Sequence, residues 1–360
     1  MQVLLDATPL ARGHATRGIG TATRELVGAL GRVRPPDQRP DLLVTRSQQV
    51  PSGFVAHRFS WPRWRLPRIP DPWPALHLNV ALDRLRPTLF HAMQPQLMPD
   101  PATHPTVVTC YDLIPLHLPM RNPLDRHVYA TFLQRLTQAR MVLAISQATA
   151  DDLTEQLGIP PERIRVVYLG LPPAATPAGP TPDVPYVLYS NGIEPHKNPE
   201  TVIRAIARIP TVHLVMTGTW SRRRLARLRT LADGLGVRSR VHFVGYTTSE
   251  HLAALRRDAV AAVVSSHREG FGFPVVEALA FGIRVIASDI AALREAGGHA
   301  ATYVEADDVD AWSAAIAEVA ADPDSRAAAA TAGPAHAATF TWERTAEATI
   351  DAWREVLRSA

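Results

Sequence analysis

Short apolar runs alternate with amphipathic segments along most of this chain. In the second half, five runs have the length and β-branched composition of buried strands, at residues 186–189, 212–217, 241–244, 260–265 and 285–287. Segments with helical periodicity lie between them, and the clearest follows Ser221, a suitable N-cap, with leucines on one face and arginines on the others. This alternation predicts a doubly wound parallel sheet with helices on both faces.

The same alternation occurs in the first half of the chain. Residues 3–5, 107–109 and 142–145 have strand character, and residues 21–30 have the periodicity of a helix. At 360 residues the chain is long enough for two α/β domains of roughly 170 residues each. We therefore expect an α/β protein with one Rossmann-like sheet in each half.

A change of composition separates the two halves. Residues 172–185 are rich in Pro, Ala, Gly and Thr, which pack poorly and suit an interdomain linker. The predicted domains are accordingly residues 1–171 and 186–341, and a final amphipathic helix begins near residue 342.

Composition narrows the functional class. The single cysteine, Cys110, excludes a disulfide framework, and no cysteine–histidine cluster has the spacing of a structural zinc site. The first ten residues lack the basic start and long apolar centre of a signal peptide, and no apolar stretch reaches membrane-spanning length. We expect a cytoplasmic protein, either free or at the inner face of the membrane.

The formal net charge of +4 comes almost entirely from arginine and suits a phosphate-rich substrate. Nucleic acid is a less favoured partner, because the chain has neither an aromatic RNA-binding strand motif nor a recognisable helix-turn-helix.

The string Glu-Gly-Phe-Gly-Phe-Pro-Val-Val-Glu at residues 269–277 carries the most chemical information. The preceding residues, 259–266, suit a buried strand, while Pro274 suits the first turn of a helix that Gly282 ends. The string therefore predicts a strand-to-helix turn, where backbone N–H groups and a helix dipole can face a ligand.

Two glycines and two carboxylates in this turn fit a sugar nucleotide. Gly270 and Gly272 would let phosphate or sugar oxygens approach the backbone closely. Glu277, one turn into the helix, can accept hydrogen bonds from ribose hydroxyls, and Glu269 can hold hydroxyls of a second sugar. The alternative is that the glycine-rich turn serves packing alone.

The string also resembles the signature of the retaining GT-B glycosyltransferases of the family 4 type. This family is grouped with the enzymes that make sucrose and glycogen and with bacterial mannosyltransferases. Further segments resemble this family in the same order, at residues 17–20, 107–115, 144–146, 194–198 and 340–344. The resemblance implies GT-B architecture, with two Rossmann-like, doubly wound parallel-sheet domains facing a cleft. It also implies that the last helix, residues 342–360, returns to complete the N-terminal domain.

The resemblance assigns roles to individual residues. Lys197 would neutralise the donor diphosphate, and Asn191 stands where the family often has a second cation. Val244 lies in a segment placed beside the nucleobase. The residues expected to contact the donor are Gly18, Gly20, Asn191, Val244, Gly270, Phe271, Gly272 and Glu277.

The expected catalytic residues are Glu269, Lys197 and Tyr111. Tyr111 occupies the position where the family usually has a histidine against the donor sugar, and its hydroxyl can still donate a hydrogen bond to a sugar. His91 and Asp112 are expected on the acceptor side. The alternatives are a structural histidine at residue 91 and a turn or helix cap at residue 112.

A segment rich in tryptophan, arginine and proline, residues 60–73, suits either a sugar-binding acceptor loop or peripheral contact with a membrane. A partly buried loop is the plain alternative. The prolines exclude a regular amphipathic helix there.

The function implied by the resemblance is transfer of a hexose, with mannose favoured, from a nucleotide-diphosphate sugar to a hydroxyl acceptor with retention of configuration. No cofactor or metal ion is expected; GDP is the favoured nucleotide, with UDP and dTDP as alternatives. The acceptor is a glycan, a lipid-linked sugar or a natural product. A sugar-nucleotide epimerase of the same fold and a non-catalytic sugar-nucleotide-binding protein are the competing hypotheses.

Overall fold

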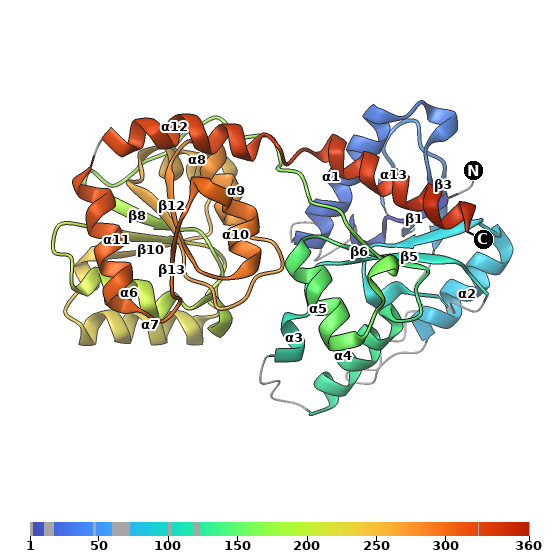
Figure 1. The fold of residues 1–360 in the computed structure, drawn as a ribbon, viewed down its shortest axis with the longest axis horizontal. Coiled ribbons are helices and arrows are strands. Elements are labelled where there is room, and N and C mark those ends of the chain that lie inside the picture. The colour runs from blue at the N-terminus through green and yellow to red at the C-terminus, as the bar shows by residue number, and fades with distance from the viewer. Residues whose placement is uncertain are drawn as a thin grey trace. The chain divides into compact units, whose positions relative to one another are not determined.

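The computed structural model describes residues 3–10, 18–45, 48–59, 73–99, 103–117, 123–322 and 324–359. The chain divides into two compact units (Figure 1). Unit 1 comprises Met1–Pro172 together with Phe340–Ala360, and unit 2 comprises Pro173–Thr339. Each unit is built on a parallel sheet, which confirms the predicted fold class.

The sheet of unit 1 has seven strands within the described residues, in the order β3-β2-β1-β4-β5-β6-β7. The strands are β1 (Val3–Asp6), β2 (Asp41–Thr45), β3 (Ala56–Phe59), β4 (Leu89–Ala92), β5 (Thr106–Cys110), β6 (Met141–Ala144) and β7 (Ile164–Val166). Strand order reverses between β1 and β4, so this is the topological switch point of the sheet. Open α/β sheets bind ligands outside the carboxyl ends of the strands at such a point.

The helices of unit 1 are α1 (Gly18–Val33), α2 (Trp73–Leu85), α3 (Ile114–His117), α4 (Pro123–Leu136), α5 (Gln147–Leu157) and α13 (Trp342–Arg358). Local sequence explains the bounds of α5. The Ser146 hydroxyl accepts a hydrogen bond from the backbone N–H of Thr149 at 3.0 Å, and Gly158 ends the helix with a φ of 64°.

Helix α13 lies beside α1 although more than 300 residues separate them along the chain (Figure 1). Its Trp353 is 2% exposed, and the indole N–H donates to Nδ1 of His91 at 3.2 Å. The Thr345 hydroxyl donates to the carbonyl of Tyr168 at 2.7 Å. The last helix is therefore an integral part of the unit 1 core.

The sheet of unit 2 has six strands within the described residues, in the order β10-β9-β8-β11-β12-β13. The strands are β8 (Tyr186–Tyr189), β9 (His213–Thr217), β10 (Val241–Gly245), β11 (Ala261–Val264), β12 (Arg284–Ser288) and β13 (Thr302–Val304). The five predicted strands are all present, whereas β13 was not predicted. Strand order reverses between β8 and β11, which is the switch point of this sheet.

The helices of unit 2 are α6 (Pro199–Ala207), α7 (Arg222–Gly234), α8 (Ser249–Asp258), α9 (Phe273–Ala280), α10 (Ala291–Gly297), α11 (Val309–Ala321) and α12 (Asp324–Ala337). Ser221 caps α7 as predicted, because its hydroxyl accepts from the backbone N–H of Arg224. Pro274 stands in the first turn of α9, and Gly282 follows the helix with a φ of 68°.

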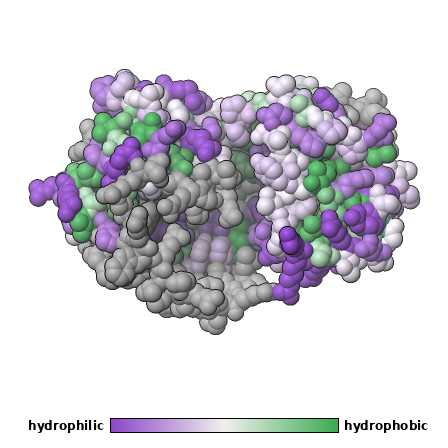
Figure 2. Space-filling model, turned by 180° about the vertical axis from the view of Figure 1, so that it is seen from behind, coloured by the Kyte–Doolittle hydropathy of each residue, from purple (hydrophilic) through white to green (hydrophobic). Residues whose placement is uncertain are grey.

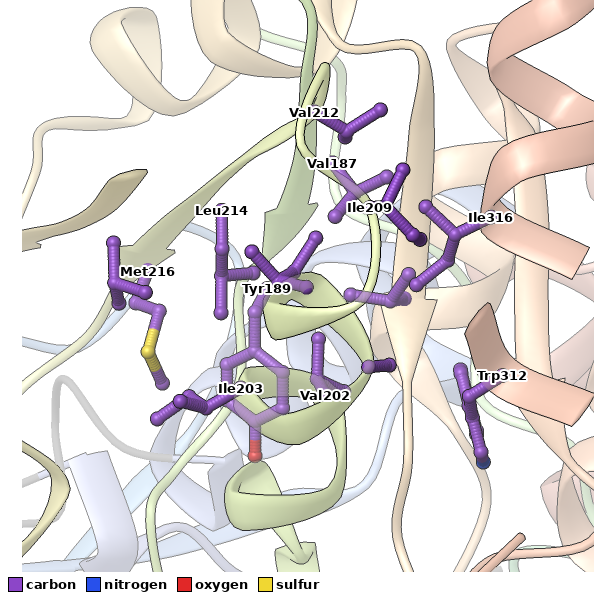
Figure 3. Close-up of a cluster of buried hydrophobic side chains, with 14 of the residues drawn as sticks. Val187, Tyr189, Val202, Ile203, Ile209, Val212, Leu214, Met216, Trp312 and Ile316 are labelled. Atoms are coloured by element: carbon purple, nitrogen blue, oxygen red, sulfur yellow. The ribbon is translucent and has the colours of Figure 1, made fainter. Parts of the chain in front are cut away.

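An apolar cluster between β8, β9, α6 and α11 forms a core of unit 2 (Figure 3). Tyr189 projects into this cluster with Val202 and Ile203. Its hydroxyl donates to the backbone carbonyls of Gly192 at 2.7 Å and Lys197 at 3.1 Å. The core thereby fixes the loop that follows β8.

Most of the predicted linker, from Pro173 onward, belongs to unit 2. Its Ala178 N–H donates to the carbonyl of Glu250 at 3.0 Å, and the Thr181 hydroxyl donates to Asp258 at 2.8 Å. The ring of His251 donates to the carbonyl of Pro180 at 2.8 Å. Polar groups in and beside α8 thus hold residues 178–181 of the predicted linker.

None of the described helices is long and apolar enough to cross a membrane. On the face shown in Figure 2, hydrophilic and hydrophobic side chains are interspersed. The tryptophan- and arginine-rich segment at residues 60–73 lies outside the described residues, apart from the backbone of Trp73, where α2 begins.

Replacing Trp353 tests the role of α13. We expect Trp353→Ala to lower the free energy of unfolding of unit 1 by about 3–5 kcal/mol, because it leaves a cavity and an unpaired His91 nitrogen. Urea denaturation measures this change. Arg354→Ala, at an exposed neighbouring position, is the control, and equal destabilisation by both variants would contradict the assignment.

Candidate functional site

Two loops meet at the switch point of unit 2. The loop after β8 carries Asn191 and Lys197, and the loop after β11 carries Ser266 and Glu269. The Lys197 ammonium donates to Oε2 of Glu269 at 2.6 Å. Oε1 of Glu269 accepts from the Ser266 hydroxyl at 2.7 Å and from the Asn191 amide at 3.1 Å. Residues from both sides of the switch point thus converge on one carboxylate.

This carboxylate is ionised despite its burial. The side chain of Glu269 is 8% exposed and that of Lys197 is 16% exposed. Burial alone would raise the pKa of Glu269, but the Lys197 charge and the hydrogen bonds from Lys197, Ser266 and Asn191 outweigh it, so the pKa is lowered. Both oxygens of Glu269 are therefore engaged within unit 2.

The backbone around Lys197 is tightly held. Lys197 ends a short 3-10 turn, and the next residue, Asn198, adopts a left-handed conformation with a φ of 49°. The Asn198 amide donates to the carbonyl of Ala306 at 2.9 Å, and the Ser265 hydroxyl donates to the carbonyl of Asn198 at 2.7 Å. These bonds tie the loop to both β11 and the segment after β13.

Lys197 is the only lysine among the 38 lysines and arginines of the chain. An ammonium is a compact charge with three donors, whereas a guanidinium is planar and larger. The partner of the buried Glu269 carboxylate is therefore the one lysine of the chain rather than an arginine.

The second glutamate of the motif is held by a different cation. Glu277 lies in α9 and forms an ion pair with Arg256 of α8. The Arg256 side chain is 10% exposed and its guanidinium lies 5.7 Å from the centroid of the Phe281 ring, whereas Glu277 is 27% exposed. Arg256 thus orients a carboxylate that solvent, or a ligand, can still reach.

The turn between the two glutamates is fixed by packing. Gly272 has a φ of 115°, and a Cβ there would lie 2.8 Å from Cδ2 of Leu293. Phe271 is 2% exposed and packs edge-to-face on Phe273, with ring centroids 5.3 Å apart. The side chain of Phe271 therefore belongs to the core, while Gly270 is partly buried.

Val244 lies on the edge strand β10 and is 41% exposed. The Gly218 N–H donates to the carbonyl of Gly245 at 2.9 Å, which joins the loops after β9 and β10. In the first of these loops, Trp220 donates to the carbonyl of Asn191 at 3.5 Å. Val244 is thereby linked through two loops to the cluster around Glu269.

Gly18 and Gly20 lie in unit 1, in the first turn of α1. Helix α1 thus begins three residues before the segment 21–30 that the sequence predicts as helical. A Cβ at Gly18 would meet no atom within 4 Å, while Gly20 is buried. Arg17, which precedes them, lies outside the described residues.

The switch point of unit 1 holds an acid that sequence analysis missed. Asp6 ends β1 with no exposed surface, and its Oδ1 accepts from the Thr8 N–H at 2.9 Å and the Thr8 hydroxyl at 2.7 Å. The other oxygen, Oδ2, has no partner among the described residues, and neither does the buried hydroxyl of Tyr111. The signal that could have revealed Asp6 is an acidic residue ending the apolar run 3–5.

Burial dominates the electrostatics of these two groups. It raises the pKa of Asp6 to about 6, although hydrogen bonds from Thr8 and the backbone of Met93 act in the opposite direction. Burial, followed by the charge of Asp6, raises the pKa of Tyr111, whose hydroxyl therefore stays protonated. Asp6 and Tyr111 are close enough to interact electrostatically.

His91 has a structural place in unit 1. It is fully buried, and its Nδ1 accepts from Trp353 while its Nε2 lies 2.9 Å from the Thr109 hydroxyl. Because Nδ1 is an acceptor, the neutral ring carries its hydrogen on Nε2. Burial lowers the pKa of His91 to about 3, which fits a neutral ring. We expected His91 on the acceptor side, but both nitrogens are engaged, so we do not include it in the site.

Asp112 adopts the alternative considered from the sequence. Its Oδ1 accepts from the backbone N–H of Ile114 at 3.0 Å, at the start of α3.

In unit 2, the aspartates Asp308 and Asp310 are separated by a single residue, and both have structural roles. Asp308 caps α11 by accepting from the Ala311 N–H at 2.9 Å, and Asp310 forms an ion pair with Arg208. Across the described part of the chain, no three His, Cys, Asp or Glu residues are grouped to hold a metal ion.

Comparisons with known proteins agree with this architecture. A family model described as "Glycosyl transferases group 1" matches residues 176–336, and one described as "Glycosyltransferase Family 4" matches residues 16–175. Sucrose-phosphate synthase from Thermosynechococcus elongatus superimposes with a TM-score of 0.81 over 100% of both chains at 20% identity. Anabaena Alr3699/HepE in complex with UDP and glucose superimposes with a TM-score of 0.73 at 18% identity, over 98% of this chain and 99% of that one.

Among curated proteins, D-inositol 3-phosphate glycosyltransferase of Mycobacterium avium (strain 104) is 37% identical over 182 residues. That match covers 49% of this chain and 43% of the relative, so it spans less than half of the relative's length. O-antigen chain mannosyltransferase B of Escherichia coli is 28% identical over 270 residues, which covers 69% of this chain and 70% of the relative.

Two parallel-sheet Rossmann-like units that match these structures over their whole length define a protein with the GT-B fold. With the two models together matching residues 16–336, the chain belongs to the glycosyltransferases of the family 4 type.

The buried Asp6 makes a testable contribution to stability. Its pKa is raised from 3.8 to about 6, so the folded protein retains a proton that the unfolded chain has lost between these values. Stability therefore falls as the pH rises from about 4 to about 6, by about 3 kcal/mol. We expect Asp6→Asn to remove this loss, so that the variant gains stability over the wild type as the pH rises.

Urea denaturation at several pH values between about 4 and 7 measures this difference. Asp151→Asn, at an exposed position of α5, is the matched control. A flat difference for Asp6→Asn would show that this carboxyl has an ordinary pKa.

Proposed function

We propose that this protein is a retaining glycosyltransferase that moves a hexose from a nucleotide-diphosphate sugar to a hydroxyl acceptor. The observation that carries this proposal is the buried Lys197–Glu269 pair at the switch point of unit 2. Nucleotide binding at this place, retention of configuration and independence from metal ions are all parts of the proposal.

Lys197 is suited to bind a diphosphate. Its ammonium has three N–H donors, of which one is used by Glu269, so two are left for phosphate oxygens. The first turn of α9 begins four residues after Glu269 and adds the positive end of a helix dipole. In the reaction, these groups would stabilise the charge that develops on the departing diphosphate.

Asn191 changes the charge of the site. A neutral amide stands where related enzymes often have a second cation, and it donates to Glu269 at 3.1 Å. Lys197 and Glu269 then balance each other, and Glu269 acts first as the group that positions the lysine. Its contact with the donor sugar belongs to the proposal.

Glu277 is proposed to hold the ribose. It is partly exposed, and its ion pair with Arg256 fixes the carboxylate while leaving one oxygen for a hydroxyl. A carboxylate with a ribose is the arrangement found in dinucleotide-binding folds.

A mannose-type hexose on GDP is our favoured donor, supported by the relative named O-antigen chain mannosyltransferase B. The solved structure that contains UDP and glucose keeps UDP as an alternative, and dTDP remains a third.

In the proposed reaction, the acceptor oxygen bonds to the anomeric carbon on the face from which the diphosphate leaves. The leaving phosphate oxygen takes the proton of the acceptor hydroxyl, so no protein nucleophile is needed.

The direct test is a thermal-shift panel of GDP-mannose, UDP-glucose, dTDP-glucose and the free nucleotides. A ligand that binds only the folded state stabilises it by about 2.7 kcal/mol at one hundred times its Kd. We expect one nucleotide series to raise Tm, and its sugar to be transferred with retained configuration when acceptors are added. Absence of any shift across the panel contradicts the proposal, and release of a sugar epimer from donor alone supports an epimerase.

The single lysine allows a sharper test of the diphosphate contact. We expect Lys197→Arg to reduce turnover at least tenfold although the charge is kept, because the planar guanidinium cannot replace a compact ammonium beside Glu269. Arg84→Lys, a swap of the same two residue types at an exposed position, should leave turnover unchanged.

Chemical labelling of the wild type provides an independent measurement. Lys197 and the N-terminus carry the only amines, so an acylating reagent modifies two places, with the N-terminus as internal reference. Bound nucleotide diphosphate should slow the labelling of Lys197 selectively. Equal labelling with and without nucleotide would place the diphosphate elsewhere.

A further inference from the structure

Several buried side-chain polar atoms of unit 1 have no hydrogen-bond partner among the described residues, and two of them belong to residues at the carboxyl ends of β1 and β5. They are Oδ2 of Asp6 and the hydroxyl of Tyr111, both shielded from solvent. A buried polar group without a partner costs stability, and native proteins rarely keep one without a reason. Here one of the two atoms is an acceptor and the other a donor, and both belong to residues at the carboxyl ends of strands of one sheet.

The local structure explains why Asp6 is only half satisfied. Thr8 supplies two donors, its backbone N–H and its hydroxyl, and both reach Oδ1 of Asp6, at 2.9 and 2.7 Å. This anchors the carboxylate and fixes its orientation. The backbone of Met93 also favours the charged carboxylate, but Oδ2 itself has no hydrogen-bond partner among the described residues.

The position of these residues in the sheet is the second observation. Asp6 ends β1, at the switch point with β4, and Tyr111 directly follows β5, the next strand after β4 in the sheet. Parallel strands bring these carboxyl ends to one edge, which is where open α/β sheets bind ligands. The charge of Asp6 also acts on Tyr111, in agreement with their proximity.

We propose that Asp6 and Tyr111 together bind one carbohydrate hydroxyl. The hydroxyl would donate its hydrogen to Oδ2 of Asp6 and accept one from Tyr111, so that all three groups are satisfied. The proposal rests on the proposed function, and it adds Asp6 as a ligand-binding residue of unit 1. The hydroxyl belongs either to the donor sugar or to the acceptor, and the experiment separates these two sources.

The variants are Asp6→Asn and Tyr111→Phe, which keep the size of each side chain. Asn keeps the oxygen that accepts from Thr8, and the pH argument above makes this variant at least as stable as the wild type near neutral pH. Loss of binding in it therefore does not reflect loss of folding. Asp151→Asn and Tyr168→Phe, at exposed positions of unit 1, are the matched controls.

The first measurement is the affinity for the free nucleotide, for the nucleotide sugar found in the panel, and for the acceptor. Asp6→Asn should weaken one carbohydrate-bearing ligand by about tenfold to a hundredfold, and Tyr111→Phe by about threefold to tenfold. Affinity for the free nucleotide should not change. A loss confined to the nucleotide sugar identifies the donor, and a loss confined to the acceptor KM identifies the acceptor.

The double variant tests whether the two residues bind the same hydroxyl. If they do, its loss of affinity should be clearly smaller than the product of the two single losses. Unchanged affinities in both single variants, or strictly multiplicative losses, would overturn the proposal.

A further measurement separates this proposal from the proposed function. If the wild type binds no nucleotide at all, titration with methyl α-D-mannopyranoside and myo-inositol still tests the subsite. We then expect a rise in Tm for the wild type and the controls that is lost in Asp6→Asn and Tyr111→Phe. Equal shifts in all five proteins, or no shift in any, would overturn the subsite.

Discussion

The ion pair between Lys197 and Glu269 is the interaction on which the candidate site of unit 2 depends. A buried charge needs an opposite charge beside it, and here the Lys197 ammonium and the Glu269 carboxylate neutralise each other. The hydrogen bonds from Asn191, Ser266 and Tyr189 hold the two loops in the geometry that the pair requires. Tyr189 connects the hydrophobic core to this pair. Its ring is buried in the core, and its hydroxyl donates to the backbone carbonyls of Gly192 and Lys197 in the loop after β8 (Figure 3).

Much of the fold could be predicted, because buried parallel strands have a strong local signature. The runs at 186–189 and 260–265 are continuous and β-branched, and the bounds of α9 follow from Pro274 and Gly282. Strand β13 was missed because three residues are too few to show a period. The contacts of the predicted linker with α8 could not be predicted, because the two segments lie about 70 residues apart in sequence.

The sequence predicted residues of the site where they belong to a recognisable motif, but it did not predict the contacts between motifs. The string 269–277 and Lys197 were found, but the network that joins Asn191 to Glu269 spans 78 residues and leaves no local pattern. His91 could not be assigned from the sequence, since its partner Trp353 lies 262 residues away. Asp6 was missed because one acid at the end of a strand is a weak signal until the structure shows its unpaired oxygen.

The course of the chain through the two units has a consequence for biosynthesis. Helix α13, which covers α1 and inserts Trp353 beside His91, is translated after the whole of unit 2. Unit 2 is continuous in sequence and can fold on the ribosome, whereas the sheet of unit 1 must wait with an apolar face uncovered. The nascent first unit therefore exposes the apolar surface that α13 later covers, and such surface makes an incompletely folded chain prone to aggregation.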